Sequence, residues 1–126
     1  MFSGIVSCIG RIRTVDRSHD CTRLHIGHSM SWDDLKIGDS ICVSGVCLTV
    51  VALTAEQFEV EFMDVTRHKT NLGQRLQGSA VNLERSLRMG DTIDGHLVYG
   101  HVDERLTLRE KRVGEGSVHF VFDLPN

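Results

Sequence analysis

Two hydroxyls and one thiol fall within one short stretch of the chain. Ser40 stands at the start of a short apolar run, and Cys47 and Thr49 lie in the next run, beyond Ser44-Gly45. Residues two apart in a strand share a face, so Cys47 and Thr49 would point the same way. Such a face would give a ligand hydrogen-bonding partners at the polar end of a β-barrel. The other interpretation, in which Thr49 only favours a strand and Cys47 packs in the core, stays open.

Histidines supply the second candidate chemistry. His96 and His101 lie in the segment 95–103, and imidazole changes charge most easily near neutral pH, which makes both candidates for proton transfer. A metal site has less support, because a spacing of five on a strand turns the two rings to opposite faces. His25 and His28 have the same difficulty, and no CxxC pair supplies further ligands. We therefore expect no bound metal.

The third candidate is a strand that ends in a turn, from Phe62 to Thr66. Backbone N–H and C=O groups at strand ends around a barrel mouth bind small ligands. A helical turn N-capped by Asp64 or Thr66 explains the same residues equally well. The sequence holds no Walker loop, GxSxG elbow or GxGxxG loop, so a P-loop and serine hydrolase chemistry lack support.

The elements that must position these groups are short strands. Apolar residues alternate with a period of two or form brief runs at 6–12, 21–26, 41–43, 46–51 and 58–62. Ser44-Gly45 between two runs is a good hairpin turn, because glycine adopts positive φ at little cost. The pattern predicts an all-β antiparallel barrel or sandwich. Helix should be limited to Ser31–Leu35, N-capped by Ser31, and to a turn or two within 64–72.

An internal repeat divides the chain. An offset of 96 residues places Phe2 on Val98, and the same offset carries residues 12, 24 and 26 onto 108, 120 and 122 without a gap. Strand, turn and strand are preserved, which indicates a duplication, although two unrelated hairpins could coincide. The expected division is one complete unit at 1–96 and the first hairpin of a truncated second unit at 97–126.

Composition is that of an ordinary globular chain. Its 126 residues are 40% hydrophobic and 25% charged, with a net charge of −3, which does not favour nucleic-acid binding. No apolar run approaches the ~18 residues of a membrane span, and no basic segment precedes the first apolar residues. We expect a cytoplasmic protein with four reduced cysteines, most of them buried.

Motifs spread over nearly the whole chain resemble those of the riboflavin synthase family. They occur in the family's order and are specific as a set. The matching segments are Met1-Phe2-Ser3-Gly4-Ile5-Val6, Gly38-Asp39-Ser40-Ile41, Gly45-Val46-Cys47-Leu48-Thr49-Val50, Thr70-Asn71-Leu72-Gly73, Val81-Asn82-Leu83-Glu84-Arg85 and Gly95-His96-Leu97-Val98-Tyr99-Gly100-His101-Val102-Asp103.

The resemblance implies a six-stranded antiparallel Greek-key β-barrel followed by an incomplete second barrel. It also implies the dismutation of two molecules of 6,7-dimethyl-8-ribityllumazine, in which one donates a four-carbon unit to the other. The products are riboflavin and 5-amino-6-ribitylamino-pyrimidinedione, and the reaction needs no metal or organic cofactor. The family assembles as a homotrimer, with each active site formed between barrels of different subunits.

The resemblance also implies site residues. Ser40, His101 and Cys47 match positions implicated in catalysis, with Cys47 beside the ligand. The substrate-binding positions are Gly4, Ile5, Val6, Cys47, Leu48, Thr49, Glu61, Phe62, Met63, Asp64, Val65, Thr66, Gly100, His101 and Val102. Those at 100–102 open the second unit and would serve a different ligand molecule from the others.

Three positions depart from the family pattern. Ser44 replaces an asparagine, Val65 replaces a glutamate at the ligand rim, and Asp94 replaces a glycine. Related proteins of this fold bind lumazine or flavin without catalysis, so a non-catalytic binding protein is the alternative function. In a further alternative, the second hairpin pairs with the edge of a partner's sheet.

Overall fold

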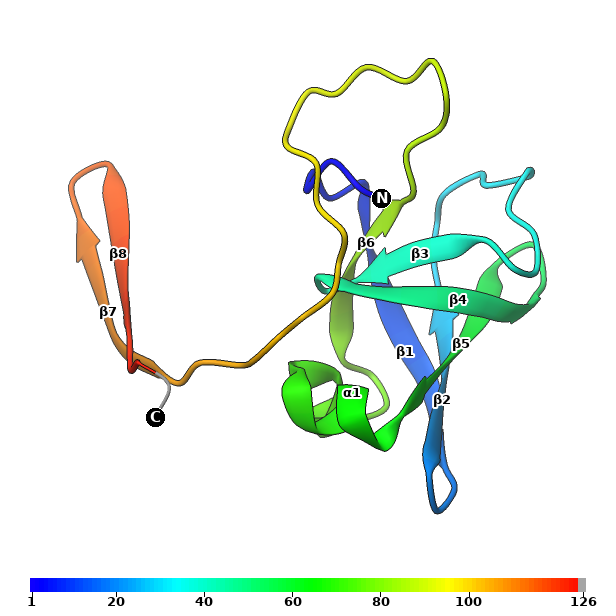
Figure 1. The fold of residues 1–126 in the computed structure, drawn as a ribbon, viewed down its shortest axis with the longest axis horizontal. Helices are drawn as coiled ribbons and strands as arrows, with labels where there is room; N and C mark the ends of the chain where they lie inside the picture. Colours follow the sequence, from blue (N-terminus) through cyan, green and yellow to red (C-terminus); the bar gives the residue numbers. More distant parts are fainter. Residues whose placement is uncertain (125–126) are drawn as a thin grey trace.

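A computed structural model describes residues 1–124 and shows a closed six-stranded barrel (Figure 1). Neighbouring strands around the barrel follow the order β1-β2-β5-β4-β3-β6, and each pair is antiparallel. This confirms the predicted Greek-key barrel. The strands are β1 (Cys8–Arg17), β2 (Cys21–Gly27), β3 (Ser40–Val43), β4 (Val46–Leu53), β5 (Gln57–Met63) and β6 (Ala80–Arg85).

The barrel interior is filled by the apolar residues of the alternating pattern. In β4, Val46, Leu48 and Val50 are buried, whereas the intervening Cys47 and Thr49 are not. The close packing also depends on Gly10, because a Cβ there would lie 2.5 Å from Leu83 Cδ1. Polar groups for a ligand must therefore come from the outer wall of the barrel or from its ends.

The β3–β4 turn forms where the sequence predicts it. Ser44 and Gly45 both adopt positive φ, at 48° and 92°, as a two-residue type I′ hairpin turn requires. Asparagine and glycine tolerate this conformation best, so Ser44 holds a position that the family's usual asparagine would occupy with less strain.

The helical segments agree only in part with the sequence prediction. Between β5 and β6 lie α1 (Asp64–Lys69) and the short 3₁₀ helix η1 (Asn71–Gln74), as expected. Neither Asp64 nor Thr66 is the N-cap of α1, because that position is Met63, with no side-chain cap. The helix predicted at Ser31–Leu35 is wrong: these residues form a turn, and five residues make too few helical hydrogen bonds to repay nucleation.

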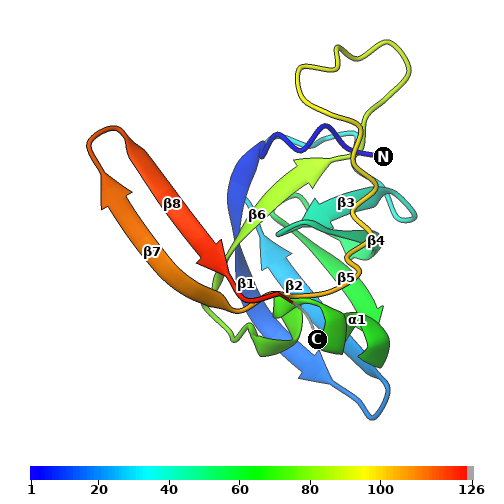
Figure 2. The same ribbon diagram turned by 60° about the vertical axis from the view of Figure 1, so that its left-hand side comes forward.

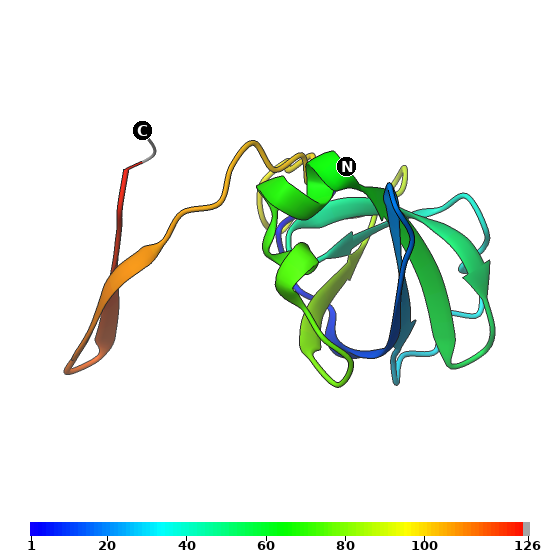
Figure 3. The same ribbon diagram turned by 90° about the horizontal axis from the view of Figure 1, so that it is seen from below.

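A second hairpin stands apart from the barrel. Strands β7 (Leu108–Gly114) and β8 (Ser117–Phe122) pair only with each other among the described strands, and nearly all their residues are exposed (Figures 1 and 3). Leu108 pairs with Phe122 as Ile12 pairs with Ile26. The next four pairs, and the register irregularity that precedes them, also recur 96 residues later. The hairpin therefore repeats the backbone pattern of β1–β2.

Residues 95–107, called the strap here, connect the barrel to this hairpin along the outer wall (Figure 2). The strap starts against the N-terminal segment, where Phe2 and Val98 exchange backbone hydrogen bonds of 2.8 and 2.9 Å. Phe2 is fully buried there. No helix within residues 1–124 is long and apolar enough to cross a membrane.

Candidate functional site

The hydroxyl and thiol residues meet on the outer face of the β3–β4 hairpin. Ser40 lies directly opposite Thr49 across the two strands, so their side chains share a face. Cys47 follows on that face, half-buried, and Thr49 is exposed. The interpretation that places Cys47 in the core is wrong. The expected polar end of the barrel is instead a polar strip on its wall.

The ladder of backbone hydrogen bonds between β4 and β5 ends next to this strip. Strands β4 and β5 pair at Val50–Val60, Ala52–Glu59 and Leu53–Phe58, and the ladder does not continue past Val50–Val60. Beyond it, residues 46–49 pair with β3 and residues 61–63 pair with β2. The predicted segments 47–49 and 61–66 therefore flank the end of this ladder. Backbone groups of β4 that point away from β3 face this break.

Residues 61–66 divide between the core and the surface. Phe62 is buried in the core, as is Leu48 on the other side of the break, so both side chains are removed from a ligand on the outer wall. Glu61 accepts a 2.8 Å hydrogen bond from Arg23 Nε, and Asp64 pairs with Arg67 at 2.8 Å. The side chains of Met63 and Val65 are exposed.

The strap brings the histidine segment to β4. The backbone N–H of Cys47 donates to the Gly100 carbonyl at 2.9 Å. Gly100 has φ +74°, and a Cβ there would lie 2.9 Å from both Cys47 Cβ and Cys47 N, so only glycine allows this contact. His101 follows, exposed, with its ring centroid 6.3 Å from that of Tyr99. The predicted residues Cys47 and Gly100 are thus in contact.

A buried carboxylate holds the N-terminal segment in place. Glu84 in β6 accepts hydrogen bonds from Ser3 N at 2.6 Å, Ser3 Oγ at 2.8 Å and Gly4 N at 3.1 Å. Its exposed fraction is 7%. Gly4 lies beside Val98 of the strap, whereas Ile5 and Val6 are half exposed. Gly4 thus lies near the strap.

The four cysteines are free thiols, and only Cys42 is buried. The expectation that most of them are buried is wrong, because Cys21 and Cys47 lie on the outer wall and Cys8 packs only partly buried against the core. Burial raises the pKa of the Cys42 thiol to about 11, and the nearby Glu84 carboxylate acts in the same direction. Cys42 is therefore protonated at neutral pH.

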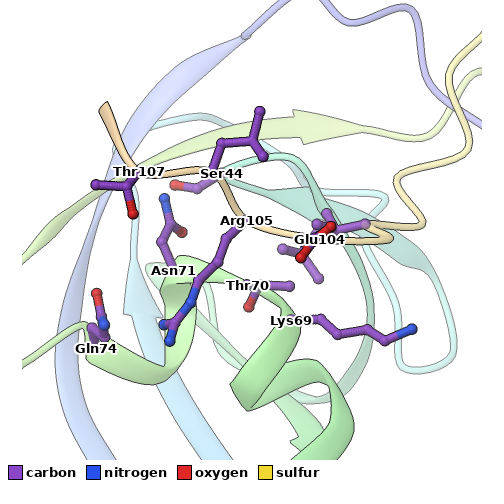
Figure 4. A pocket seen from close by; sticks show the side chains of 11 residues that line it. Ser44, Lys69, Thr70, Asn71, Gln74, Glu104, Arg105 and Thr107 are labelled. Carbon is purple, nitrogen blue, oxygen red and sulfur yellow. The ribbon is translucent and has the colours of Figure 1, made fainter. Parts of the chain in front are cut away.

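An open pocket of about 560 Å³ lies between the strap, the β3–β4 turn and the helical segment (Figure 4). Val102 is the one predicted site residue in its lining. Most other lining side chains are polar: Ser44, Lys69, Thr70, Asn71, Gln74, Glu104, Arg105 and Thr107. In Figure 4, Arg105 reaches from the strap toward η1, whereas Lys69 points away. Thr70 links the pocket to Thr66, whose carbonyl accepts from Thr70 Oγ1 at 2.8 Å.

His25 and His28 belong to other contacts. His25 lies 2.8 Å from Asp16 and 3.3 Å from Glu59, and His28 stacks on Trp32 with ring centroids 4.7 Å apart. Desolvation lowers the pKa of His28. Within residues 1–124, no three His, Cys, Asp or Glu side chains gather as metal ligands do.

Comparison with known families identifies the family to which this barrel belongs. The model of the family described as "Lumazine binding domain" matches residues 3–86, which span the whole barrel. The chain belongs to the lumazine-binding domain family. The break between β4 and β5 and the Glu84 anchor both lie within the matched residues.

Curated relatives of this lumazine-binding barrel are riboflavin synthases. The chain is 38% identical to that of Brucella abortus over 99% of its own length and 64% of the relative's. The corresponding values for Bacillus subtilis are 39%, 98% and 57%, and for Mycobacterium tuberculosis 44%, 82% and 52%. The chain thus spans between about half and two thirds of the length of these relatives.

Solved structures agree with the barrel fold. The crystal structure of LumP complexed with 6,7-dimethyl-8-(1'-D-ribityl) lumazine superposes with a TM-score of 0.86 at 23% identity, over 99% of this chain and 69% of that one. The complex of LumP with riboflavin gives 0.85 over 99% and 68%. The likeness extends past the barrel to the β7–β8 hairpin.

Sequence reasoning missed two parts of this lumazine-binding barrel. Glu84 was noted only within a motif, and no local pattern marks it as the anchor of Ser3 and Gly4, 80 residues away. The helical side of the pocket, with Asn71 and Gln74, was also missed.

Proposed function

We propose that the protein is a riboflavin synthase in which this barrel holds one of two molecules of 6,7-dimethyl-8-ribityllumazine. One lumazine donates a four-carbon unit to the other, which yields riboflavin and 5-amino-6-ribitylamino-pyrimidinedione. Support comes from the riboflavin synthases among the relatives. The observation that carries the proposal is the break in the β4–β5 ladder, flanked by the two segments that the family motifs assign to substrate.

The lumazine ring would bind at this break. The backbone groups of Cys47 and Thr49 face away from β3, the Cys47 N–H already donates to the Gly100 carbonyl, and the Thr49 hydroxyl stands on the outer face of the wall. A flat heterocycle with alternating donors and acceptors suits such an edge, as a further strand would. Thr66 and the polar pocket beyond Thr70 lie at the end of β5, on the side where a ribityl chain would extend.

Catalytic roles follow from the chemistry of the substrate. Its ring carries an acidic methyl group and an electrophilic carbon, so the site must orient two heterocycles and move protons. His101, exposed on the strap next to Gly100, would relay protons. Ser40, opposite Thr49, would direct the ring or an added nucleophile, and Cys47 would contact the ligand.

The second lumazine would bind to a second barrel that begins with the strap. The division at 96/97 is supported by the recurrence of the β1–β2 register in β7–β8, and residues 125–126 lie outside the described part. The proposal includes a homotrimer, no metal or organic cofactor, and a cytoplasmic location.

Ligand titration and turnover test the proposal. The full chain should quench the fluorescence of 6,7-dimethyl-8-ribityllumazine, and riboflavin absorbance should appear on incubation. Thr49→Val, which removes only the hydroxyl, should weaken binding about fivefold, as expected for the loss of one hydrogen bond. Thr54→Val, at an exposed threonine just past β4, is the matched control and should bind normally.

The outcomes separate the alternatives. Binding without riboflavin formation at high protein concentration would favour the non-catalytic lumazine- or flavin-binding protein, for which the exposed Val65 in place of a glutamate is the specific observation. Absence of binding would reject both functions. Equal weakening by Thr49→Val and Thr54→Val would contradict the placement of the ring.

A further inference from the structure

Two cysteines face each other across the β3–β4 hairpin. Cys42 and Cys47 are direct partners in the antiparallel register, one pair beyond the Val43–Val46 pair that closes the turn. Side chains of directly opposed residues lie on the same face of a sheet. The inward neighbours Ile41 and Val43 are fully buried in the core, so Cys42 points outward, as Cys47 does.

The backbone hydrogen bonds identify the type of this pair. In a two-residue hairpin the residues that flank the turn bond to each other, and the next pair does not. Consistent with this, the Cys47 N–H points away from β3 and donates to the Gly100 carbonyl at 2.9 Å. Cα atoms of such a non-hydrogen-bonded pair are about 4.5 Å apart, with close side chains. A disulfide spans Cα distances of roughly 4.4–6.8 Å, so this pair lies within the permitted range.

The surroundings of the two thiols differ. Cys42 is 7% exposed and lines a pocket of about 140 Å³ together with Phe2, Gly4 and Val98. Cys47 is half-buried beneath Gly100 and is the thiol that a small solute reaches first. Burial keeps the pKa of Cys42 high, so Cys42 is a poor nucleophile in its own right.

We propose that Cys42 and Cys47 form a reversible disulfide when the protein meets a hydroperoxide, which makes the β3–β4 hairpin a redox-modifiable element. The Cys47 thiolate attacks one peroxide oxygen, the O–O bond breaks, and hydroxide leaves, so Cys47 becomes a sulfenic acid. The Cys42 sulfur then attacks the Cys47 sulfur, and its proton leaves with the sulfenic oxygen as water. Two thiols are oxidised, and one hydrogen peroxide is reduced to two waters.

This modification does not depend on the proposed function. The disulfide would alter Cys47, which lies on the outer wall where ligand binding is proposed. Its sulfur would turn toward β3 and away from the break in the β4–β5 ladder. Dithiothreitol would restore both thiols.

Peptide mass spectrometry of the full chain tests the proposal directly. Trypsin releases Cys42 and Cys47 together in the peptide 37–67, while Cys8 and Cys21 fall in peptides 1–11 and 18–23. After brief hydrogen peroxide treatment and alkylation with N-ethylmaleimide, peptide 37–67 should be unalkylated and about 2 Da lighter than its dithiol form. This product should exceed any cross-link to Cys8 or Cys21 by roughly tenfold or more, because pairing across a hairpin has a high effective concentration.

Two variants test the order of the steps. In Cys42→Ala, the Cys47 sulfenic acid has no partner and should be trapped by dimedone. In Cys47→Ser, Cys42 should give little dimedone adduct. The proposal is overturned if peptide 37–67 keeps two maleimides while Cys8 and Cys21 are oxidised, if Cys47 pairs with another cysteine or a second chain, or if dimedone labels Cys42 as readily as Cys47.

Discussion

At the scale of single residues, Glu84 anchors the start of the chain next to the site. Its buried carboxylate accepts from three donors of Ser3 and Gly4, and these tie the start of the chain to β6. Hydrogen bonds to a charged acceptor are stronger than neutral ones. The position of the N-terminal segment thus depends on one side chain that comes late in the barrel.

Replacement of Glu84 tests this role. Glu84→Ala should lower the free energy of unfolding by about 1.5–3 kcal/mol, the usual net contribution of hydrogen bonds to a charged group. Glu84→Gln, which keeps an acceptor oxygen, should cost less. Urea denaturation measures both, with Glu56→Ala at an exposed position as control. A Glu84→Ala value within 0.5 kcal/mol of that control, about the range of neutral surface changes, would contradict the anchoring role.

At the scale of elements, the strap and the β3–β4 hairpin form one unit. Gly100 rests on Cys47 so closely that the strap follows the outer wall and places His101 beside it. The strap would not hold this geometry alone, because it has no ladder of its own beyond the Phe2–Val98 bridge. The placement of the histidine is therefore a property of the contact between the two segments.

A pair of glycine substitutions separates crowding from backbone strain. Gly90 and Gly100 both have positive φ, but a Cβ at Gly90 would meet nothing within 4 Å. Gly90→Ala should cost about 1–2 kcal/mol, the price of a left-handed alanine, and Gly100→Ala about 1–3 kcal/mol more from overpacking. Hydrogen exchange of the Cys47 amide should accelerate only in Gly100→Ala. Equal effects of the two variants would show that the strap does not depend on this contact.

The strands illustrate what local sequence can predict. The alternation of apolar residues with a period of two predicted five strands, and the Ser-Gly pair predicted the β3–β4 turn. Both signals lie in neighbouring residues, so the local sequence is sufficient to show them. The Ser31–Leu35 helix failed because Trp32 and Leu35 pack onto the barrel as a turn. The contacts of Glu84 with Ser3 and of Gly100 with Cys47 join residues more than 50 positions apart, and only the closed barrel brings them together. The site segments were predicted through family motifs rather than through geometry.

At the scale of the whole molecule, the chain presents the same hairpin twice in two environments. Ile12, Leu24 and Ile26 are buried in the barrel, whereas their counterparts Leu108, Phe120 and Phe122 are about half exposed. The same pairing pattern thus occurs once with a core and once without one. The barrel and the second hairpin should respond differently to the same kind of mutation.

Equivalent truncations test this independence. Leu24→Ala should lower the free energy of unfolding by about 2–5 kcal/mol, as expected for a core position. Phe120→Ala, at the equivalent position 96 residues later, should change it by less than about 0.5 kcal/mol, because the side chain covers no core. Thermal and urea unfolding of the 126-residue chain measure both. A large decrease in the free energy of unfolding of Phe120→Ala would show that the hairpin packs on the barrel in solution.

The repeated register also creates a risk of exchange, because a folding chain holds two hairpins with one pairing scheme. Only a hairpin with glycine at the position of Gly10 fits this place in the barrel, because Gly10 lies against Leu83 with no room for a Cβ. Its counterpart 96 residues later is Leu106, a large side chain. If β7–β8 took the place of β1–β2, Leu106 would collide with β6. The two hairpins are therefore not interchangeable in this barrel, because the space at Gly10 does not admit a leucine side chain.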